Sequence, residues 1–178
     1  MLLQRFLRNF RLLSNIMKQI WAPWRMKFIN AKKTKGCVFC RKLKEKKDSE
    51  NLVLYRGKKM SVIMNLYPYN NGHLMVVPNR HTAEFSSLTD EELLELMKLT
   101  GFAMESLKKS CKPGGFNVGI NLGKAAGAGI KNHLHVHIVP RWIGDGNFMP
   151  VIGRTKVISE SLCETYKKLK KVIRPRQT

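Results

Sequence analysis

Three histidines alternate with apolar residues late in the chain, where the sequence from Asn132 to Arg141 is NHLHVHIVPR. In a β-strand, alternate side chains point to the same face, so His133, His135 and His137 would form one row. The apolar residues that separate and follow them would point into the core: Leu134, Val136 and Ile138. The row holds three of the chain's five histidines, which indicates a functional site rather than one structural histidine.

Two kinds of chemistry use such a row. Two neutral imidazoles spaced two residues apart on a strand can bind one zinc ion. Alternatively, a neutral imidazole nitrogen can attack phosphorus and later leave, which gives a phosphoramidate intermediate. Neighbouring histidines would then donate hydrogen bonds to the phosphate oxygens as charge develops. The row by itself leaves both chemistries open.

The loop before the row favours phosphate as the ligand. Between Gly123 and Gly129 it contains three glycines and three alanines. Small residues let the backbone approach a ligand closely and point several N–H groups at an anion. A glycine-rich loop alone is weak evidence, but its place directly before the histidines predicts a phosphate-binding site.

Cys37 and Cys40 form a pair at a spacing that suits a metal or redox site. As half of a zinc site, the pair needs two more ligands to complete a tetrahedron. Burial as two small apolar side chains is the alternative. A redox role is disfavoured because the pair is predicted to lie in a lysine-rich loop, with no helix N-terminus after it. With four cysteines in all, the chain is not a secreted disulfide scaffold, which favours a reducing compartment.

The elements that position these residues follow from turn signals and periodicity. Short apolar runs broken by turn residues predict three strands, at 52–56, 61–66 and 72–78. A helix then begins after Thr89, with Glu92 as its capping-box partner and Leu88 and Leu93 as a hydrophobic staple. Its predicted apolar face includes Leu93, Leu96, Met97, Leu99, Phe102, Met104 and Leu107.

Two further strands are predicted at 116–123 and 132–142, followed by a helix at 159–172. This order, a strand cluster, one long helix and two more strands, predicts an α+β domain built on an antiparallel sheet. Nothing in the sequence indicates an internal repeat.

The chain has 178 residues, with 33 Lys and Arg against 12 Asp and Glu, which gives a net charge of +21. Such a surface attracts polyanions without specifying which one. Apolar residues make up 43%, enough for a globular core, and no apolar run reaches transmembrane length.

Residues 1–20 read as a basic amphipathic extension, because Leu3, Phe6 and Leu7 begin an apolar stripe beside arginines and no acidic residue precedes Glu45. This pattern is typical of an organelle transit peptide and also of a helix on a membrane surface. A simpler interpretation is an upstream extension of little consequence, since Met17 could start the chain. A cytoplasmic location is expected, or an organelle if the extension acts as a transit peptide.

The segment from His133 to Val139 matches the pattern His-φ-His-φ-His-φ-φ, where φ is apolar, and the chain resembles the histidine triad (HIT) family there. Four other segments resemble its microbial diadenosine tetraphosphate phosphorylase-like (ATP adenylyltransferase-like) branch: 21–25, 65–73, 121–123 and 140–142. The similarity covers residues 21–158, which defines the expected domain. A C-terminal helix and basic tail would occupy 159–178.

The resemblance implies a five-stranded antiparallel sheet with one long helix and a C-terminal helix, the sheet continuing across a homodimer. It also implies cleavage of diadenosine tetraphosphate by inorganic phosphate to ADP and ATP, through a covalent AMP-histidine intermediate. Many HIT hydrolases carry Gln four residues before the first histidine, where this chain has Gly129. That departure favours phosphorolysis, and hydrolysis of a dinucleoside polyphosphate or adenylate conjugate stays the alternative.

Residue by residue, the resemblance makes His135 the nucleophile, has His137 contact the phosphate and has His133 organise the site or ligate a metal. The nucleotide would be bound by His137 together with four further residues: Asn65, Asn121, Ala128 and Gly129. A structural zinc would be held by Cys37, Cys40, His81 and His133. No organic cofactor is implied, and a divalent cation could accompany the nucleotide.

Two other hypotheses start from the same residues. A metallohydrolase would use the histidine row as zinc ligands and lose activity with its metal. A basic zinc-containing module would bind nucleic acid, as the charge allows, but aromatic and basic residues are not interleaved as stacking on single strands requires. Nucleic acid is therefore not the expected partner.

Overall fold

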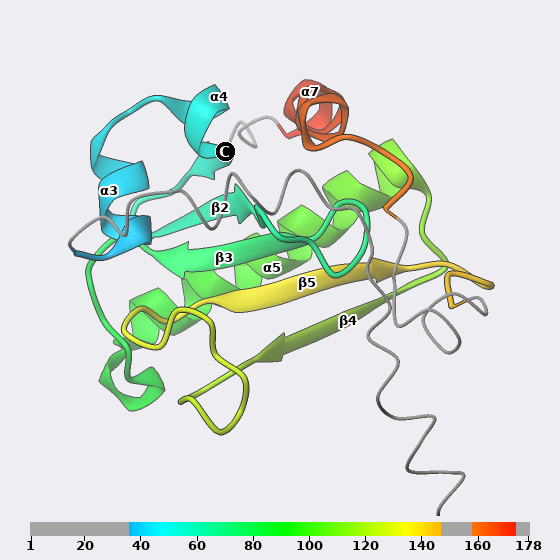
Figure 1. Cartoon of the computed structure of the whole chain (residues 1–178). Helices are drawn as coiled ribbons and strands as arrows, with labels where there is room; N and C mark the ends of the chain where they lie inside the picture. The colour runs from blue at the N-terminus through cyan, green and yellow to red at the C-terminus, as the bar shows by residue number, and fades with distance from the viewer. Residues whose placement is uncertain (1–35, 147–157, 174–178) are drawn as a thin grey trace, which may run out of the picture.

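The structure, a computed structural model, describes residues 36–146 and 158–173. Its centre is a five-stranded antiparallel sheet in the order β1-β2-β3-β5-β4 (Figure 1). The strands are β1 Val53–Arg56, β2 Met60–Met64, β3 Leu74–Pro78, β4 Gly115–Ile120 and β5 Val136–Arg141. The sheet and its helices confirm the predicted α+β fold. The expected extension at 1–20 and the basic tail after residue 173 lie outside the described residues.

One long helix, α5 Asp90–Cys111, covers one face of the sheet (Figure 1). The predicted capping box is present: the Thr89 hydroxyl accepts from the Glu92 backbone N–H, and the Glu92 carboxylate accepts from that of Thr89. Leu96, Ala103 and Leu107 face the main core. The predicted apolar face was wrong at Met97, which is 68% exposed because the core-facing positions recur on the other side of the helix.

The predicted loop around the cysteine pair is instead helical, and the sequence prediction was wrong there. Helix α3 runs over Val38–Lys44 and α4 over Asp48–Asn51. The basic residues that suggested a solvated loop lie in the last turn of α3, where positive charge complements the helix dipole. Phe39 of α3 packs on the second face of the sheet in a smaller apolar cluster.

The C-terminal helix is α7 Leu162–Val172, three residues shorter at its start than predicted because Ser161 caps it. Leu169 is fully buried against the main core. Tyr166 Oη donates to the Val53 carbonyl and Lys170 Nζ to the Leu54 carbonyl. Strand β1 is thus covered by α7, whereas β4, at the opposite edge, pairs only with β5 among the described residues. The short 3₁₀ helix η1 Phe85–Ser87 precedes α5.

The predicted strand at 132–142 pairs only from Val136 onward. Its first partners are Val76 of β3 and Ile120 of β4, and before them the Leu134 N–H bonds to the Thr82 carbonyl outside the sheet. The strand predicted at 116–123 accordingly ends at Ile120, because the pairing with β5 stops there and no other described residue continues it. The first two triad histidines therefore lie on the segment that precedes the ladder, with His133 at a bend.

No helix within the described ranges is both long and apolar enough to cross a bilayer.

Candidate active site and metal centre

The three histidines of the row are all buried, between 1% and 8% exposed. The rings of His135 and His137 lie 4.8 Å apart between centroids, and Phe39 of α3 contacts both His133 and His135 at 5.3 and 5.4 Å. The alternating apolar residues pack in the main core on the other side, as predicted: Leu134, Val136 and Ile138. Sheet geometry thus separates a histidine side from an apolar side.

His135 is oriented by its own backbone. Its Nδ1 lies 2.8 Å from the carbonyl oxygen of His133, so Nδ1 carries a proton and donates it to that oxygen. A neutral imidazole has only one N–H, and the other nitrogen, Nε2, then keeps its lone pair. Among the described residues, no hydrogen bond to this nitrogen is present. An imidazole oriented in this way has a nitrogen that can act as a nucleophile.

His133 belongs to a different group. Its Nδ1 lies 3.2 Å from Cys37 Sγ and 3.6 Å from Cys40 Sγ, and Cys40 Sγ lies 3.3 Å from His81 Nδ1. One ligand atom from each of these four residues lies within 4.8 Å of the others. A tetrahedral zinc with Zn–S near 2.3 Å and Zn–N near 2.0–2.1 Å separates sulfur from nitrogen by roughly 3.5 Å. The four side chains therefore fit a metal ion.

The tautomer of His133 also suits a metal. Its Nε2 lies 2.9 Å from the Pro78 carbonyl, to which it donates, so Nδ1 presents a lone pair to the cysteines. Such a bond from the second nitrogen to a carbonyl is the usual support of a metal-ligating histidine. Burial is the main cause that lowers the pKa of His133 and keeps it neutral. The two ring nitrogens of His133 thus contact the Pro78 carbonyl and the cysteines, and neither contacts the ring of His135.

The cysteine pair lies at a helix N-terminus after all, since Cys37 is the N-cap of α3. That premise against a redox role was wrong, yet the surroundings still disfavour one. A reactive cysteine needs a lowered pKa. Burial, followed by the hydrogen bond and charge of Cys37, instead raises the pKa of the Cys40 thiol. Two histidines complete the cluster, which is the composition of a structural metal site.

His73, which the sequence analysis did not single out, joins the remaining two histidines. His73 directly precedes β3, and its Nε2 lies 2.9 Å from Nδ1 of His137 in β5. Burial, and then the charges of His137 and His135, lower the pKa of His73 to about 3; burial, and then His135, lower that of His137 to about 4. Both rings are neutral at pH 7. The signal that could have found His73 is the register that places β3 beside β5.

The HIT domain family model matches residues 46–142. This chain belongs to the HIT family. It is 44% identical to an "AP-4-A phosphorylase" of Mycobacterium tuberculosis, over 84% of this chain and 80% of that protein. A HIT-like protein of Methanocaldococcus jannaschii is 33% identical over 75% of this chain and 98% of its own. The relatives place the chain among HIT enzymes, and the matched residues lie inside the domain predicted at 21–158.

Solved HIT structures share the fold. A Zn-bound histidine triad family protein from Mycobacterium smegmatis has a TM-score of 0.63 at 25% identity, over 77% of this chain and 92% of that one. A hypothetical histidine triad nucleotide-binding protein from Sulfolobus tokodaii has a TM-score of 0.62 at 31% identity, over 77% of this chain and 89% of that one. The metal in the first of these relatives belongs to that protein, and its fold matches the sheet and helices described above.

The remaining predicted site residues of the HIT domain are only partly gathered around the row. Asn121, just after β4, places its amide Nδ2 3.5 Å from His137 Nε2. Asn65 contacts His73 instead of the histidine row: its Nδ2 is 3.3 Å from His73 Nδ1, and its Oδ1 accepts from the Tyr67 N–H. Asn65 therefore supports the histidines through the 65–73 loop.

The glycine-rich loop uses some of its own donors. The Ala128 N–H bonds to the Gly123 carbonyl and the Gly127 N–H to that of Lys124, so two donors expected to face an anion are engaged inside the loop. Gly123 and Gly127 adopt positive φ, as a tight turn requires. Gly129 makes no such bond among the described residues. The loop is compact, and its placement does not by itself define an anion site.

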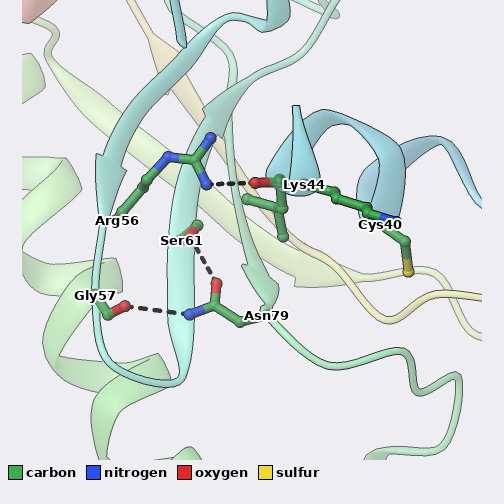
Figure 2. Close-up of a pocket in the computed structure, with 7 residues that line it drawn as sticks. Cys40, Lys44, Arg56, Gly57, Ser61 and Asn79 are labelled. Carbon is green, nitrogen blue, oxygen red and sulfur yellow. Dashed lines mark hydrogen bonds between the residues drawn. The ribbon is translucent and has the colours of Figure 1, made fainter. Parts of the chain in front are cut away.

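A separate pocket of about 400 Å³ lies between α3 and the strands, lined by Cys40 and Lys44 from α3 and by Arg56 from the end of β1 (Figure 2). Its polar groups already bond to one another: Ser61 Oγ donates to Asn79 Oδ1 and Asn79 Nδ2 to the Gly57 carbonyl. It contains none of the triad histidines. The pocket is therefore separate from the histidine row.

Proposed function

We propose that the chain is a nucleotidyl-transferring phosphorylase, which cleaves a dinucleoside polyphosphate such as diadenosine tetraphosphate with inorganic phosphate. The observation that carries this proposal is the His135 ring, whose Nδ1–H is bound to the His133 carbonyl at 2.8 Å and whose Nε2 keeps its lone pair. The 44% identical relative named AP-4-A phosphorylase supports the substrate class.

The reaction then runs in two displacements on one phosphorus. His135 Nε2 attacks the α-phosphorus, the P–N bond forms, and the bond to the bridging oxygen breaks, so that ATP leaves and AMP stays on the imidazole. A phosphate oxygen next attacks the same phosphorus and the P–N bond breaks, which releases ADP and returns the lone pair to Nε2. The His133 carbonyl accepts the Nδ1–H bond throughout and stabilises the positive ring.

The surrounding residues would bind and polarise the phosphoryl group. His137 would donate from Nε2 to a phosphoryl oxygen, with Asn121 beside it. Asn65 would shape the 65–73 loop. The backbone of Ala128 and Gly129 would line the phosphate pocket, with the Ala128 N–H bonded to the Gly123 carbonyl. The net charge of +21 would speed the encounter with the polyanionic substrate, and a divalent cation could accompany that substrate.

We infer that the four-residue cluster holds a structural zinc, since thiolate and imidazole ligands at these distances suit that ion. A bound zinc would tie α3 to the segment that carries the histidine row. Because Phe39 of α3 packs on the ring of His135, this tie would also hold the nucleophile in place. Free thiols and a zinc site both suit a reducing compartment such as the cytoplasm.

Products in the presence and absence of phosphate will separate phosphorolysis from hydrolysis. With diadenosine tetraphosphate and phosphate, we expect ADP and ATP in equal amounts, resolved by anion-exchange chromatography. Without phosphate, ADP should not form. Formation of AMP and ATP at the same rate under both conditions would contradict phosphorolysis.

Hydrolysis is the second candidate because a bis(5'-nucleosyl)-tetraphosphatase [asymmetrical] of Schizosaccharomyces pombe is 35% identical over 50% of this chain. Both reactions would share the first displacement. The presence of Gly129, where many HIT hydrolases have Gln, favours phosphate as the second nucleophile.

We also propose a homodimer that extends the sheet through β4. This strand leaves Asn117, Val118 and Gly119 exposed, and α5 exposes Leu94 and Met97. Unpaired edges with apolar side chains are sites of strand pairing, and the other edge is already covered by α7. A two-fold axis beside β4 would join two sheets into one.

The variant Val118→Lys tests this interface. Val118 is 47% exposed in the single chain, so the fold should tolerate the change. In a dimer the lysine would be buried without a partner, which should raise the dissociation constant roughly a hundredfold. Analytical ultracentrifugation measures this, with Leu66→Lys as the control because Leu66 is 45% exposed but lies away from β4. An unchanged dimer in V118K would contradict the proposed interface.

A further inference from the structure

His73 has hydrogen-bond partners on both ring nitrogens. Its Nδ1 faces two donors, the backbone N–H of Tyr69 at 3.0 Å and the amide Nδ2 of Asn65 at 3.3 Å. A backbone N–H can only donate, so Nδ1 of His73 must be the acceptor. In the neutral ring, the single proton of His73 is therefore on Nε2.

The tautomer of His73 in turn determines that of His137. The Nε2–H of His73 points at Nδ1 of His137, 2.9 Å away, so that Nδ1 accepts. The proton of neutral His137 must then be on Nε2, the nitrogen that faces Asn121. Which nitrogen of an imidazole carries the proton is set by the bond that the other nitrogen makes. One backbone N–H thus sets the tautomers of two histidines in series.

The loop that carries this donor is firmly held. Asn70 Nδ2 donates to the Pro140 carbonyl and to the Asp145 carboxylate, which ties the loop to the end of β5. Gly72 adopts a φ of +71°, and a Cβ there would lie 3.0 Å from the Leu107 side chain, so the turn requires glycine. The Tyr69 ring also packs on His73 at 4.6 Å between centroids. These contacts connect the Tyr69 N–H donor and the rings of His73 and His137 to the end of β5.

Both rings must be neutral for the Tyr69 N–H to set the tautomers of His73 and His137. Burial is the largest cause that lowers the pKa of His73 to about 3 and of His137 to about 4. Both rings are therefore neutral near pH 7, and each has a single N–H. The Asn121 amide, 3.5 Å from His137 Nε2, must turn its oxygen toward that N–H.

We propose that His73 is a positioning residue. It accepts from the Tyr69 N–H, donates from Nε2 to His137 Nδ1, and so fixes the Nε2–H of His137 as the donor to the transferred phosphoryl group. The identity of that group rests on the proposed function. The fixed tautomer does not, because it follows from contacts within the substrate-free protein. A histidine retained only for packing would fill the same volume without dictating the protonation of its neighbour.

The test is ¹⁵N NMR of histidine-labelled, substrate-free protein, combined with kinetics on His73→Gln and His73→Leu. We expect one tautomer of His137 in the wild type, protonated at Nε2. Gln retains an N–H donor at the end of its side chain and should keep this tautomer, with kcat within about threefold. Leu removes the donor, so both tautomers should appear and kcat should fall roughly 10- to 100-fold with little change in KM.

Three outcomes would overturn the proposal: Nδ1 protonation of His137 in the wild type, an unchanged tautomer in H73L, or equal losses of kcat in H73Q and H73L. The wild-type spectrum decides even if H73L does not fold. Failure of the proposed function is recognised separately, because it would remove turnover of dinucleoside polyphosphates by the wild type and leave the spectrum as predicted.

Discussion

Replacement of His135 by Asn is expected to lower kcat for diadenosine tetraphosphate cleavage roughly 10⁴- to 10⁶-fold, the range seen when a covalent nucleophile is removed. The Asn amide can still donate to the His133 carbonyl, which now accepts the Nδ1–H bond at 2.8 Å. The ring nitrogen that attacks phosphorus is lost. Burst and steady-state kinetics measure the effect, and both phases should disappear together.

Nucleotide affinity should change little in H135N, because the other binding groups stay in place. Titration calorimetry with AMP and thermal unfolding provide the controls for a correctly folded pocket. Turnover within tenfold of the wild type, in a folded variant, would contradict the assignment of His135. A loss of AMP binding equal to the loss of kcat would instead assign His135 to binding.

Replacement of Cys40 by Ser is expected to remove bound zinc and to destabilise the fold. Cys40 Sγ lies within 3.6 Å of both His81 Nδ1 and His133 Nδ1, so its loss opens the centre of the cluster. A ligand present at a thousand times its dissociation constant stabilises the folded state by about 4.1 kcal/mol. For a chain of this size, this corresponds to a fall in Tm of roughly 8–16 °C.

Atomic absorption and calorimetry measure the zinc content and the melting temperature, and Cys163→Ser is the matched control because that thiol is exposed on α7, outside the cluster. The control should keep one zinc per chain and its Tm. A wild type that binds no zinc, or a C40S variant that keeps it, would contradict the metal centre. Under the metallohydrolase hypothesis, by contrast, activity would track the metal at the remaining row histidines, His135 and His137.

The histidine row shows what periodicity can predict. Alternation alone placed three imidazoles opposite Leu134, Val136 and Ile138, and the packing confirms it. Alternation could not show that His133 turns its Nδ1 toward the cysteines while His135 turns its Nδ1 back to a carbonyl. Those choices depend on side-chain rotations and on partners from α3, which is distant in sequence.

Other differences have equally local causes. Helix α3 was missed because its lysines suggested a solvated loop, and they complement the helix dipole instead. Met97 was placed in the core because it is apolar and adjacent to Leu96, but its position on the helix points away from the side that Leu96, Ala103 and Leu107 turn to the core. His73 was missed because its role arises from the pairing of Met75 with His137, a contact between strands that are 62 residues apart in the chain. The contact between His73 and His137 depends on how β3 pairs with β5, which local sequence patterns do not show.

The most direct test is mass spectrometry of the wild type mixed with diadenosine tetraphosphate without phosphate and quenched within the first turnover. The second displacement then lacks its nucleophile, and AMP should accumulate on the tryptic peptide 132–141, with fragment ions that assign it to His135. The adduct should disappear on addition of phosphate and should not form in H135N. Product formation without any adduct, or AMP on another residue, would contradict the covalent mechanism.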